Sequence, residues 1–245
     1  TIIAGTGNDT IRLNNGTNSV SGGAGTDTIT AASGTNTIDA GDNADTILLL
    51  DGNNTVFGGS GNDTITASGG TNTIATDSGD NTVLLNDGNN SVNAGSGADT
   101  LTAESGFNTI LAGDGNDTIR LNNGTNSVSG GAGADTITAV SGLNKIEAGL
   151  DADVINLNGG DNTVKGDSGA DSITASIGNN VIDAGVDNDT ITATGGNNTI
   201  DADAGEDTIR LNDGTNSVSG GTGADTITAA SGLNTIDAGI GNDTI

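Results

Sequence analysis

The chain has 245 residues, with 43 Gly, only two Phe and no Pro, Cys, Met, Trp or Tyr, a composition that excludes an ordinary globular core. The absence of Cys and His leaves no disulfide framework and argues against a zinc or copper site. Thirty-two acidic and five basic residues give a net charge of −27, which excludes a general nucleic-acid surface and favours cations as partners. No apolar run is long enough for direct membrane insertion.

One residue pattern runs through the whole chain without insertion or deletion. Every ninth position from Asp9 to Asp243 is Asp or Asn, and two residues after it stands Ile, Val or Leu. Gly usually lies two residues before it, and where this Gly is replaced the substitutes are Asn43, Asp151 and Asp187. Asn and Asp are the non-Gly residues that best tolerate a left-handed backbone, so we expect a positive φ at this position.

The key residue alternates along the chain, so the structural period is eighteen residues. Asp9 is followed by Asn18 and then Asp27, and the alternation continues to Asp243 with Asn81 as the only break. Around each of these positions apolar and polar residues alternate with a period of two, which is typical of a half-buried strand. We therefore expect a flattened solenoid in which each coil has one acidic turn and one neutral turn on opposite edges.

A second inward position lies two residues after each recurring Ile, Val or Leu of the repeat. The residues at this position on the two sides of a coil are complementary in size. Leu13 pairs with Gly22 and Leu49 with Gly58, whereas most other coils carry Ala on both sides. A large residue opposite a small one keeps the core volume of each coil nearly constant, as close packing requires. This pattern predicts two sheets packed face to face.

The nonapeptide unit resembles the repeat of the RTX (repeats-in-toxin) family, GGxGxDxUx, in which U is a large apolar residue. Gly22–Thr30 reads GGAGTDTIT, and Gly58–Thr66, Gly130–Thr138 and Gly220–Thr228 match as closely. The resemblance implies an all-β, right-handed parallel β-roll with two nonapeptides in each coil and two stacked parallel sheets. It also implies that the Gly-rich half is a turn that binds Ca²⁺ and the other half a short strand. We expect residues 1–245 to form a single continuous array within a longer protein.

The stacked acidic turns predict a row of metal ligands. Neighbouring carboxylates about 5 Å apart repel by about 1 kcal/mol in water and more when partly buried. A hard cation between successive coils reverses this, with carboxylates and backbone carbonyls as ligands, and a flexible carbonyl-rich turn favours Ca²⁺ over Mg²⁺. We expect about one Ca²⁺ for each 18-residue coil. The expected ligands are Asp9, Asp27, Asp45, Asp63, Asp99, Asp117, Asp135, Asp153, Asp171, Asp189, Asp207, Asp225 and Asp243.

Two features qualify this row. The gaps beside Asn81 are expected to bind weakly or to depend on Asp77 and Asp80. The neutral edge, with Asn18 and Asn36, lacks charge and predicts stacked ladders of side-chain amides instead of ions, unlike the two-sided binding usual in the family. The alternative to a metal row is a metal-free solenoid whose Asp column simply faces solvent.

The pattern gives no indication of an enzyme, because a solenoid filled with Ile, Val, Ala and Leu offers no concave site for a nucleophile or base. The resemblance implies an extracellular or cell-surface bacterial protein, commonly exported by a type I system and folded by external Ca²⁺. We predict a structural role as a rigid rod in a surface fibril, sheath, S-layer or adhesin stalk, with self-association into a fibril or layer.

Two alternatives remain open. The array is also typical of the secretion and folding module of a type I secreted toxin, protease or lipase, whose chemistry lies in another domain. Regular Thr rows, as at Thr28 and Thr64, suggest an ice-binding solenoid as a minor alternative, although Arg12 and Arg120 interrupt the row.

Overall fold

A computed structural model describes residues 1–245, and the chain is all-β with no helix. It consequently has no helical segment that could cross a membrane. Two compact units can be distinguished, one comprising Thr1–Thr118 with Gly124–Asn126 and the other Ile119–Asn123 with Ser127–Ile245. Strands β14 (Thr118–Leu121) and β15 (Thr125–Ala132) contain residues of both units.

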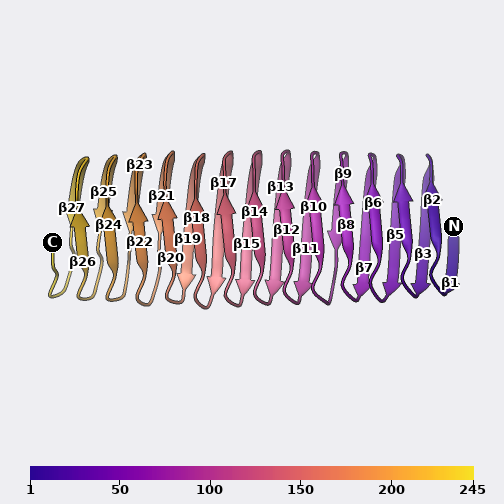
Figure 1. Ribbon diagram of the computed structural model, residues 1–245, viewed down its shortest axis with the longest axis horizontal. Coiled ribbons are helices and arrows are strands. Elements are labelled where there is room, and N and C mark those ends of the chain that lie inside the picture. The colour runs from indigo at the N-terminus through magenta and orange to yellow at the C-terminus, as the bar shows by residue number, and fades with distance from the viewer. The chain divides into compact units, whose positions relative to one another are not determined.

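The first unit consists of two parallel sheets whose strands alternate along the chain (Figure 1). One sheet contains β1 (Ile2–Thr6), β3 (Thr17–Ala24), β5 (Thr35–Asp42), β7 (Asn53–Ser60), β9 (Thr71–Ala75), β11 (Asn89–Ser96) and β13 (Phe107–Asp114). The other contains β2 (Thr10–Leu13), β4 (Thr28–Ala31), β6 (Thr46–Leu49), β8 (Thr64–Ala67), β10 (Thr82–Leu85) and β12 (Thr100–Ala103). We call them the odd sheet and the even sheet.

The second unit repeats the same arrangement. Its odd sheet contains β17 (Leu143–Leu150), β19 (Asp161–Ser168), β21 (Asn179–Asp183), β23 (Asn197–Asp201), β25 (Thr215–Ser219) and β27 (Leu233–Asp237). Its even sheet contains β16 (Thr136–Ala139), β18 (Val154–Leu157), β20 (Ser172–Ala175), β22 (Thr190–Ala193), β24 (Thr208–Leu211) and β26 (Thr226–Ala229). Each unit is therefore a β-solenoid with two strands in every coil.

The register confirms the period of eighteen residues. In the even sheet Ile29 pairs with Ile47, and in the odd sheet Val20 pairs with Ile38, so each residue lies beside its equivalent in the next coil. The same offset holds in the second unit, where Ile155 pairs with Ile173. Identical offsets throughout place each position of the repeat in a column that runs across the sheet, which confirms the two parallel sheets expected from the sequence.

The core lies between the two sheets and is made of the predicted apolar columns. Ile29 and Ile38 are fully buried, and the second inward column, which includes Leu49 and Ala67, is equally inaccessible. Burying one such Ile or Leu side chain contributes about 1.5–3 kcal/mol, so the columns supply the main apolar stabilisation of each coil. Thr28 and its equivalents point outward and are exposed. The alternation read from the sequence therefore gives the correct face for each side chain.

The backbone of the acidic turn also follows the prediction. Asn43, Asp151 and Asp187 have φ values of 78°, 73° and 82°, which confirms the left-handed conformation. A second left-handed position lies two residues earlier. In most coils it is Gly, as at Gly23, where a Cβ atom would collide with the carbonyl oxygen of Gly5. The same place is occupied in other coils by Asp77, Asp167 and Asp203, at φ values of 65°, 72° and 67°.

The family resemblance implied that the Gly-rich half of the repeat is a turn, but part of this half is strand. β3 continues through the Gly pair and β5 through the equivalent Ala40 and Gly41, so that Gly23 pairs with Gly41 in the ladder. In β9 and β21 the strand ends before this point. The turn itself is consequently short, and the Asp that follows it stands directly before an even strand.

Candidate metal centre

The acidic turn joins the end of each odd strand to the next even strand, and its Asp is buried. Asp27 precedes β4 and Asp63 precedes β8, and their exposed fractions are 0% and 1%. Asp171 in the second unit is equally inaccessible, at 2%. The alternative of a solvent-facing Asp column is therefore wrong, because these side chains are buried inside the solenoid.

Hydrogen bonds stack the Asp residues of successive coils within each unit. The backbone N–H of Asp27 donates to Oδ1 of Asp45 at 2.7 Å, and that of Asp45 donates to Oδ1 of Asp63 at 2.8 Å. In the second unit Asp153 donates in the same way to Asp171 at 2.8 Å. The predicted ligands thus form one column from Asp9 to Asp117, with Asn81 within it, and one from Asp135 to Asp243.

In ten of the stacked residues the second carboxylate oxygen has no donor. Oδ2 is buried and accepts no hydrogen bond in Asp9, Asp27, Asp45, Asp63, Asp99, Asp153, Asp171, Asp189, Asp207 and Asp225. A buried carboxylate oxygen without a partner costs far more than an ordinary lost hydrogen bond. Buried polar groups in folded proteins almost always have a hydrogen-bond partner. A regular series of buried carboxylate oxygens without one therefore indicates that each binds a cation or carries a proton.

Backbone oxygens face the same space as Oδ2. A Cβ atom at Gly22 would collide both with Oδ2 of Asp27 and with the carbonyl oxygen of Ala40, which belongs to the next coil. At Gly166 the corresponding atoms are Oδ2 of Asp171 and a carbonyl oxygen of the following coil. Two acceptors from successive coils therefore converge where no donor is present. Carboxylate and carbonyl oxygens are the ligands that Ca²⁺ prefers, so the residues present fit this ion.

No group of three or more Asp, Glu, His or Cys side chains gathers anywhere in the chain to hold a metal. Each coil except that of Asn81 contributes one carboxylate to the column, so backbone carbonyls must complete the oxygen shell of any ion there. The sequence predicts carboxylates and backbone carbonyls as ligands, but it does not specify which carbonyl lies beside Oδ2, such as that of Ala40. In coils with a Gly pair the signal was its first residue, such as Gly22, which leaves room beside Oδ2, whereas Ala40 stands at this place before Asp45.

Burial makes the ionised column costly. It raises the pKa of Asp153 and Asp189 to about 7, because the charged form loses its hydration, and the carboxylates of Asp135 and Asp171 add repulsion. The same loss of hydration raises the pKa of Asp63, Asp171 and Asp207 to about 6. The hydrogen bond from the preceding backbone N–H opposes these shifts without cancelling them. At neutral pH, positive charge beside the column would therefore stabilise its ionised carboxylates.

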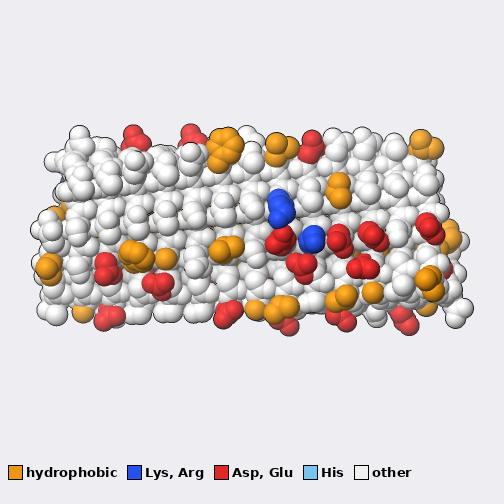
Figure 2. Space-filling view, turned by 180° about the vertical axis from the view of Figure 1, so that it is seen from behind, with side chains coloured by type: hydrophobic (Ala, Val, Ile, Leu, Met, Phe, Trp, Pro, Cys, Tyr) orange, Lys and Arg blue, Asp and Glu red, His pale blue; other side chains and the backbone are white.

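The two lysines do not supply this charge. Lys145 forms an ion pair with Glu147 at 2.6 Å on the surface, where it lowers the pKa of the Glu147 carboxyl. Lys165 lies beside Glu147 in the neighbouring strand and beside Asp183 in the next. On the face shown in Figure 2 the few Lys and Arg side chains lie among exposed acidic ones. These contacts are on the outer face of the odd sheet, away from the buried Asp column.

The neutral edge forms the predicted amide ladder. Nδ2 of Asn36 donates to Oδ1 of Asn54 at 2.8 Å, and Asn54 donates to Asn72 at the same distance. Nδ2 of Asn36 also donates to the carbonyl oxygen of Ser33, three residues earlier. Each amide therefore finds both a donor and an acceptor within the protein, and no buried Asn oxygen lacks a partner. The two edges of the solenoid differ in that only the acidic one leaves acceptors unsatisfied.

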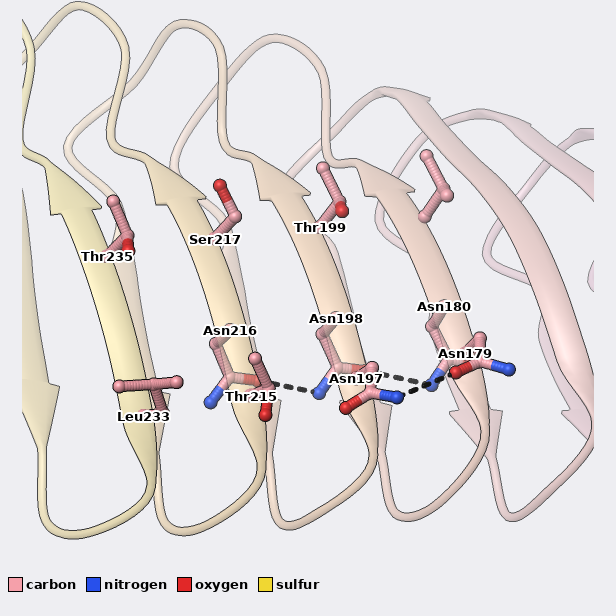
Figure 3. Close-up of a pocket in the computed structure, with 11 residues that line it drawn as sticks. Asn179, Asn180, Asn197, Asn198, Thr199, Thr215, Asn216, Ser217, Leu233 and Thr235 are labelled. Atoms are coloured by element: carbon pink, nitrogen blue, oxygen red, sulfur yellow. Dashed lines mark hydrogen bonds between the residues drawn. The ribbon is translucent and has the colours of Figure 1, made fainter.

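The outer face of the odd sheet carries a shallow hollow over β21–β27, with a volume of about 350 Å³ (Figure 3). It is lined by Thr199, Ser217 and Leu233 and by a second amide ladder, in which Asn197 donates to Asn179 at 3.0 Å. The amide groups at its floor form hydrogen bonds with one another. This surface offers no nucleophile paired with a base.

Comparison with known families agrees with the geometry. A search among curated proteins found no match. The family described as RTX calcium-binding nonapeptide repeat (4 copies) matches overlapping windows throughout the chain, at residues 1–29, 12–47, 21–56, 30–65, 49–83, 66–101, 76–110, 85–119, 102–137, 129–164, 138–173, 157–191, 174–209, 184–218 and 210–245. The stacked Asp turns, the nonapeptide register and these matches together show that the chain belongs to the RTX calcium-binding nonapeptide repeat family.

Proposed function

We propose that the chain binds a row of Ca²⁺ ions along its acidic edge, with about one ion for each coil. The observation that carries this proposal is the series of buried Oδ2 atoms without a donor, such as those of Asp27 and Asp171. These oxygens, with backbone carbonyls such as that of Ala40, would hold the ion between successive coils. The bound ion would supply the positive charge that the buried carboxylates lack.

Ion binding and folding are coupled in this proposal. The sites exist only when coils are stacked, because each site takes oxygens from two coils. Without cations, a net charge of −27 and a buried carboxylate in nearly every coil oppose the folded state. Any ligand that binds only the folded state stabilises it by mass action, so Ca²⁺ acts as a switch for folding.

The role that we propose is structural: a continuous rigid rod in a bacterial surface fibril, sheath, S-layer or adhesin stalk that assembles with further copies. Support comes from the unbroken repeat over residues 1–245 and from cores built of stacked coils rather than around a pocket. An extracellular location and type I export belong to the same proposal, since external Ca²⁺ would fold a chain that remains unfolded inside the cell.

The second candidate role is the secretion and folding module of a type I secreted toxin, protease or lipase. Membership of the family supports this role as much as the first. A catalytic domain elsewhere in the full-length protein would favour it. Ice binding finds less support, because Arg12 and Leu48 stand in line with Thr30 and interrupt the outward Thr rows.

The test is a Ca²⁺ titration of chelated protein, followed by far-ultraviolet circular dichroism, with ions counted on the folded form. We expect β structure to develop with Ca²⁺ and about one ion for each coil, whereas Mg²⁺ at the same concentration has little effect because it demands a stricter geometry. A full β signal in chelator with no ion retained would overturn the proposal. About two ions for each coil would show that the Asn edge binds as well.

A further inference from the structure

One coil departs from the others at the position of the buried Asp. Asn81 takes the place of Asp and is equally buried, with 1% of its surface exposed. The stacking bonds continue through it, because the backbone N–H of Asp63 donates to Oδ1 of Asn81 at 2.9 Å and the N–H of Asn81 donates to Oδ1 of Asp99 at 2.7 Å. The change from Asp to Asn therefore leaves the column in register.

The other polar atom of Asn81 has a partner that the Asp residues lack. Nδ2 donates to the carbonyl oxygen of Gly79 at 2.8 Å. In the coils on either side the corresponding atom is Oδ2 of Asp63 or Asp99, an acceptor without a donor. The amide of Asn81 thus uses a carbonyl that could otherwise face a cation, and its N–H groups would repel one.

A second substitution in the same coil removes another candidate ligand. Thr76 stands five residues before Asn81, where Gly22 precedes Asp27 by the same spacing. Thr76 is fully buried, and its hydroxyl donates to the carbonyl oxygen of Ala94 in the next coil at 2.7 Å. That carbonyl is equivalent to the one of the following coil that faces Gly22 beside Oδ2 of Asp27.

The two nearby acids do not replace the missing carboxylate. Asp77 and Asp80 are both exposed, and Oδ1 of Asp80 accepts a hydrogen bond from the backbone N–H of Ala98 at 2.8 Å on the surface of the turn. Neither side chain lies in the buried column beside Asn81. Asp77 adds repulsion to Asp63 and Asp80 adds repulsion to Asp99, so both carboxylates lie near the column, but each is exposed and neither takes the buried place of the missing carboxylate.

We propose that the turn from Thr76 to Asn81 is metal-independent, because its own hydroxyl and amide donors satisfy the acceptors that a cation would satisfy in the other acidic turns. This inference rests on the proposed Ca²⁺ row and predicts an interruption in it. Within the first unit, ions would bind among Asp9, Asp27, Asp45 and Asp63, and again at Asp99 and Asp117, but not beside Asn81. Thr76 and Asn81 thus act as specificity-determining residues that exclude the cation from one coil.

A direct test is a crystal structure of the full chain with Ca²⁺, in which anomalous scattering locates each ion. We expect a peak between Asp27 and Asp45 and no peak within ligand distance of Asn81. A peak beside Asn81 would overturn the inference while leaving the Ca²⁺ row intact. The absence of peaks throughout would instead overturn the proposed function, and the inference with it.

A paired variant provides an independent measurement. Thr76→Gly combined with Asn81→Asp places Gly and Asp at the same spacing as Gly58 and Asp63. We expect the folded variant to bind about one or two more Ca²⁺ ions than the unaltered chain, because one new carboxylate borders two gaps. Asp87→Asn, on the exposed part of the neighbouring neutral turn, is the matched control and should leave the ion count unchanged. An unchanged count in the folded double variant would contradict the inference.

Discussion

The backbone N–H of Asp189 donates to Oδ1 of Asp207 at 2.7 Å, while Oδ2 of Asp207 is buried with no hydrogen-bond partner. One oxygen of the same carboxylate therefore holds successive coils in register, and the other is left for a cation. Asn can perform the first task, as Asn81 does when it accepts from Asp63, but not the second. An Asp→Asn change should consequently separate register from ion binding.

Asp207→Asn is expected to retain the stacking bond and to lose an ion ligand. The folded variant at saturating Ca²⁺ should bind about one or two ions fewer than the unaltered chain, because the lost carboxylate borders two gaps. Asp213→Asn removes the same charge from an exposed side chain of the neutral turn and should leave the ion count unchanged. Equal losses in both variants, measured by ion counting, would mean that net charge rather than the buried oxygen controls binding.

Acid should favour folding of the metal-free protein. The pKa of Asp153 and Asp189 is raised from 3.8 to about 7 in the folded state, so their protonated forms stabilise the fold fully below about pH 3.8. This stabilisation is lost as the pH rises through about 6 to 7. In chelator, circular dichroism should therefore show β structure increasing as the pH falls from 7 to 4. No gain over this range would contradict the prediction, and the Ca²⁺-loaded protein should release ions over the same range.

Asn54→Ala should destabilise the folded protein without changing its ion count. The substitution removes one of the two acceptors of Nδ2 of Asn36, which keeps the carbonyl of Ser33, and leaves Oδ1 of Asn72 without a donor; a buried unsatisfied group costs about 1–3 kcal/mol. Urea unfolding at saturating Ca²⁺ measures the loss. Thr46→Ala, at an exposed outward position, should change the free energy of unfolding by no more than about 0.5 kcal/mol. A neutral result for Asn54→Ala would mean that the amide ladder contributes nothing to stability.

Gly22→Ala should weaken Ca²⁺ binding at one coil, because Leu13 fills the opposite inward position there. In the next coil Ala31 lies opposite Ala40 instead, which leaves room for Ala before Asp45. The added Cβ would collide with Oδ2 of Asp27 and the carbonyl oxygen of Ala40, and relief of such overpacking typically costs about 1–3 kcal/mol. Gly69→Ala is the control, since a Cβ there has no neighbour closer than 3.6 Å and φ is not left-handed. Calcium titrations followed by circular dichroism should show a higher midpoint for the first variant only. Matching midpoints for the two variants would show that this space is not part of an ion site.

Much of the fold could be predicted because each feature depends on residues close together in the chain. The nine-residue spacing and the alternation around Ile29 predict strand, face and register, since a period of two decides which side chains point inward. The left-handed φ of Asn43 follows from the residue types that replace Gly there. The amide ladder of Asn36 follows from stacking like residues every eighteen positions.

The sequence by itself determined the period, the two sheets, the apolar columns and the identity of the acidic turn, because a strict repeat imposes the same local constraint on every coil. Only the tertiary structure decided how each polar atom is satisfied. Oδ2 of Asp27 faces a carbonyl of the next coil, while the amide of Asn81 and the hydroxyl of Thr76 find acceptors of their own. These outcomes depend on the rotamer of each polar side chain and on atomic contacts between coils, and a pattern of residue types along one chain does not specify either.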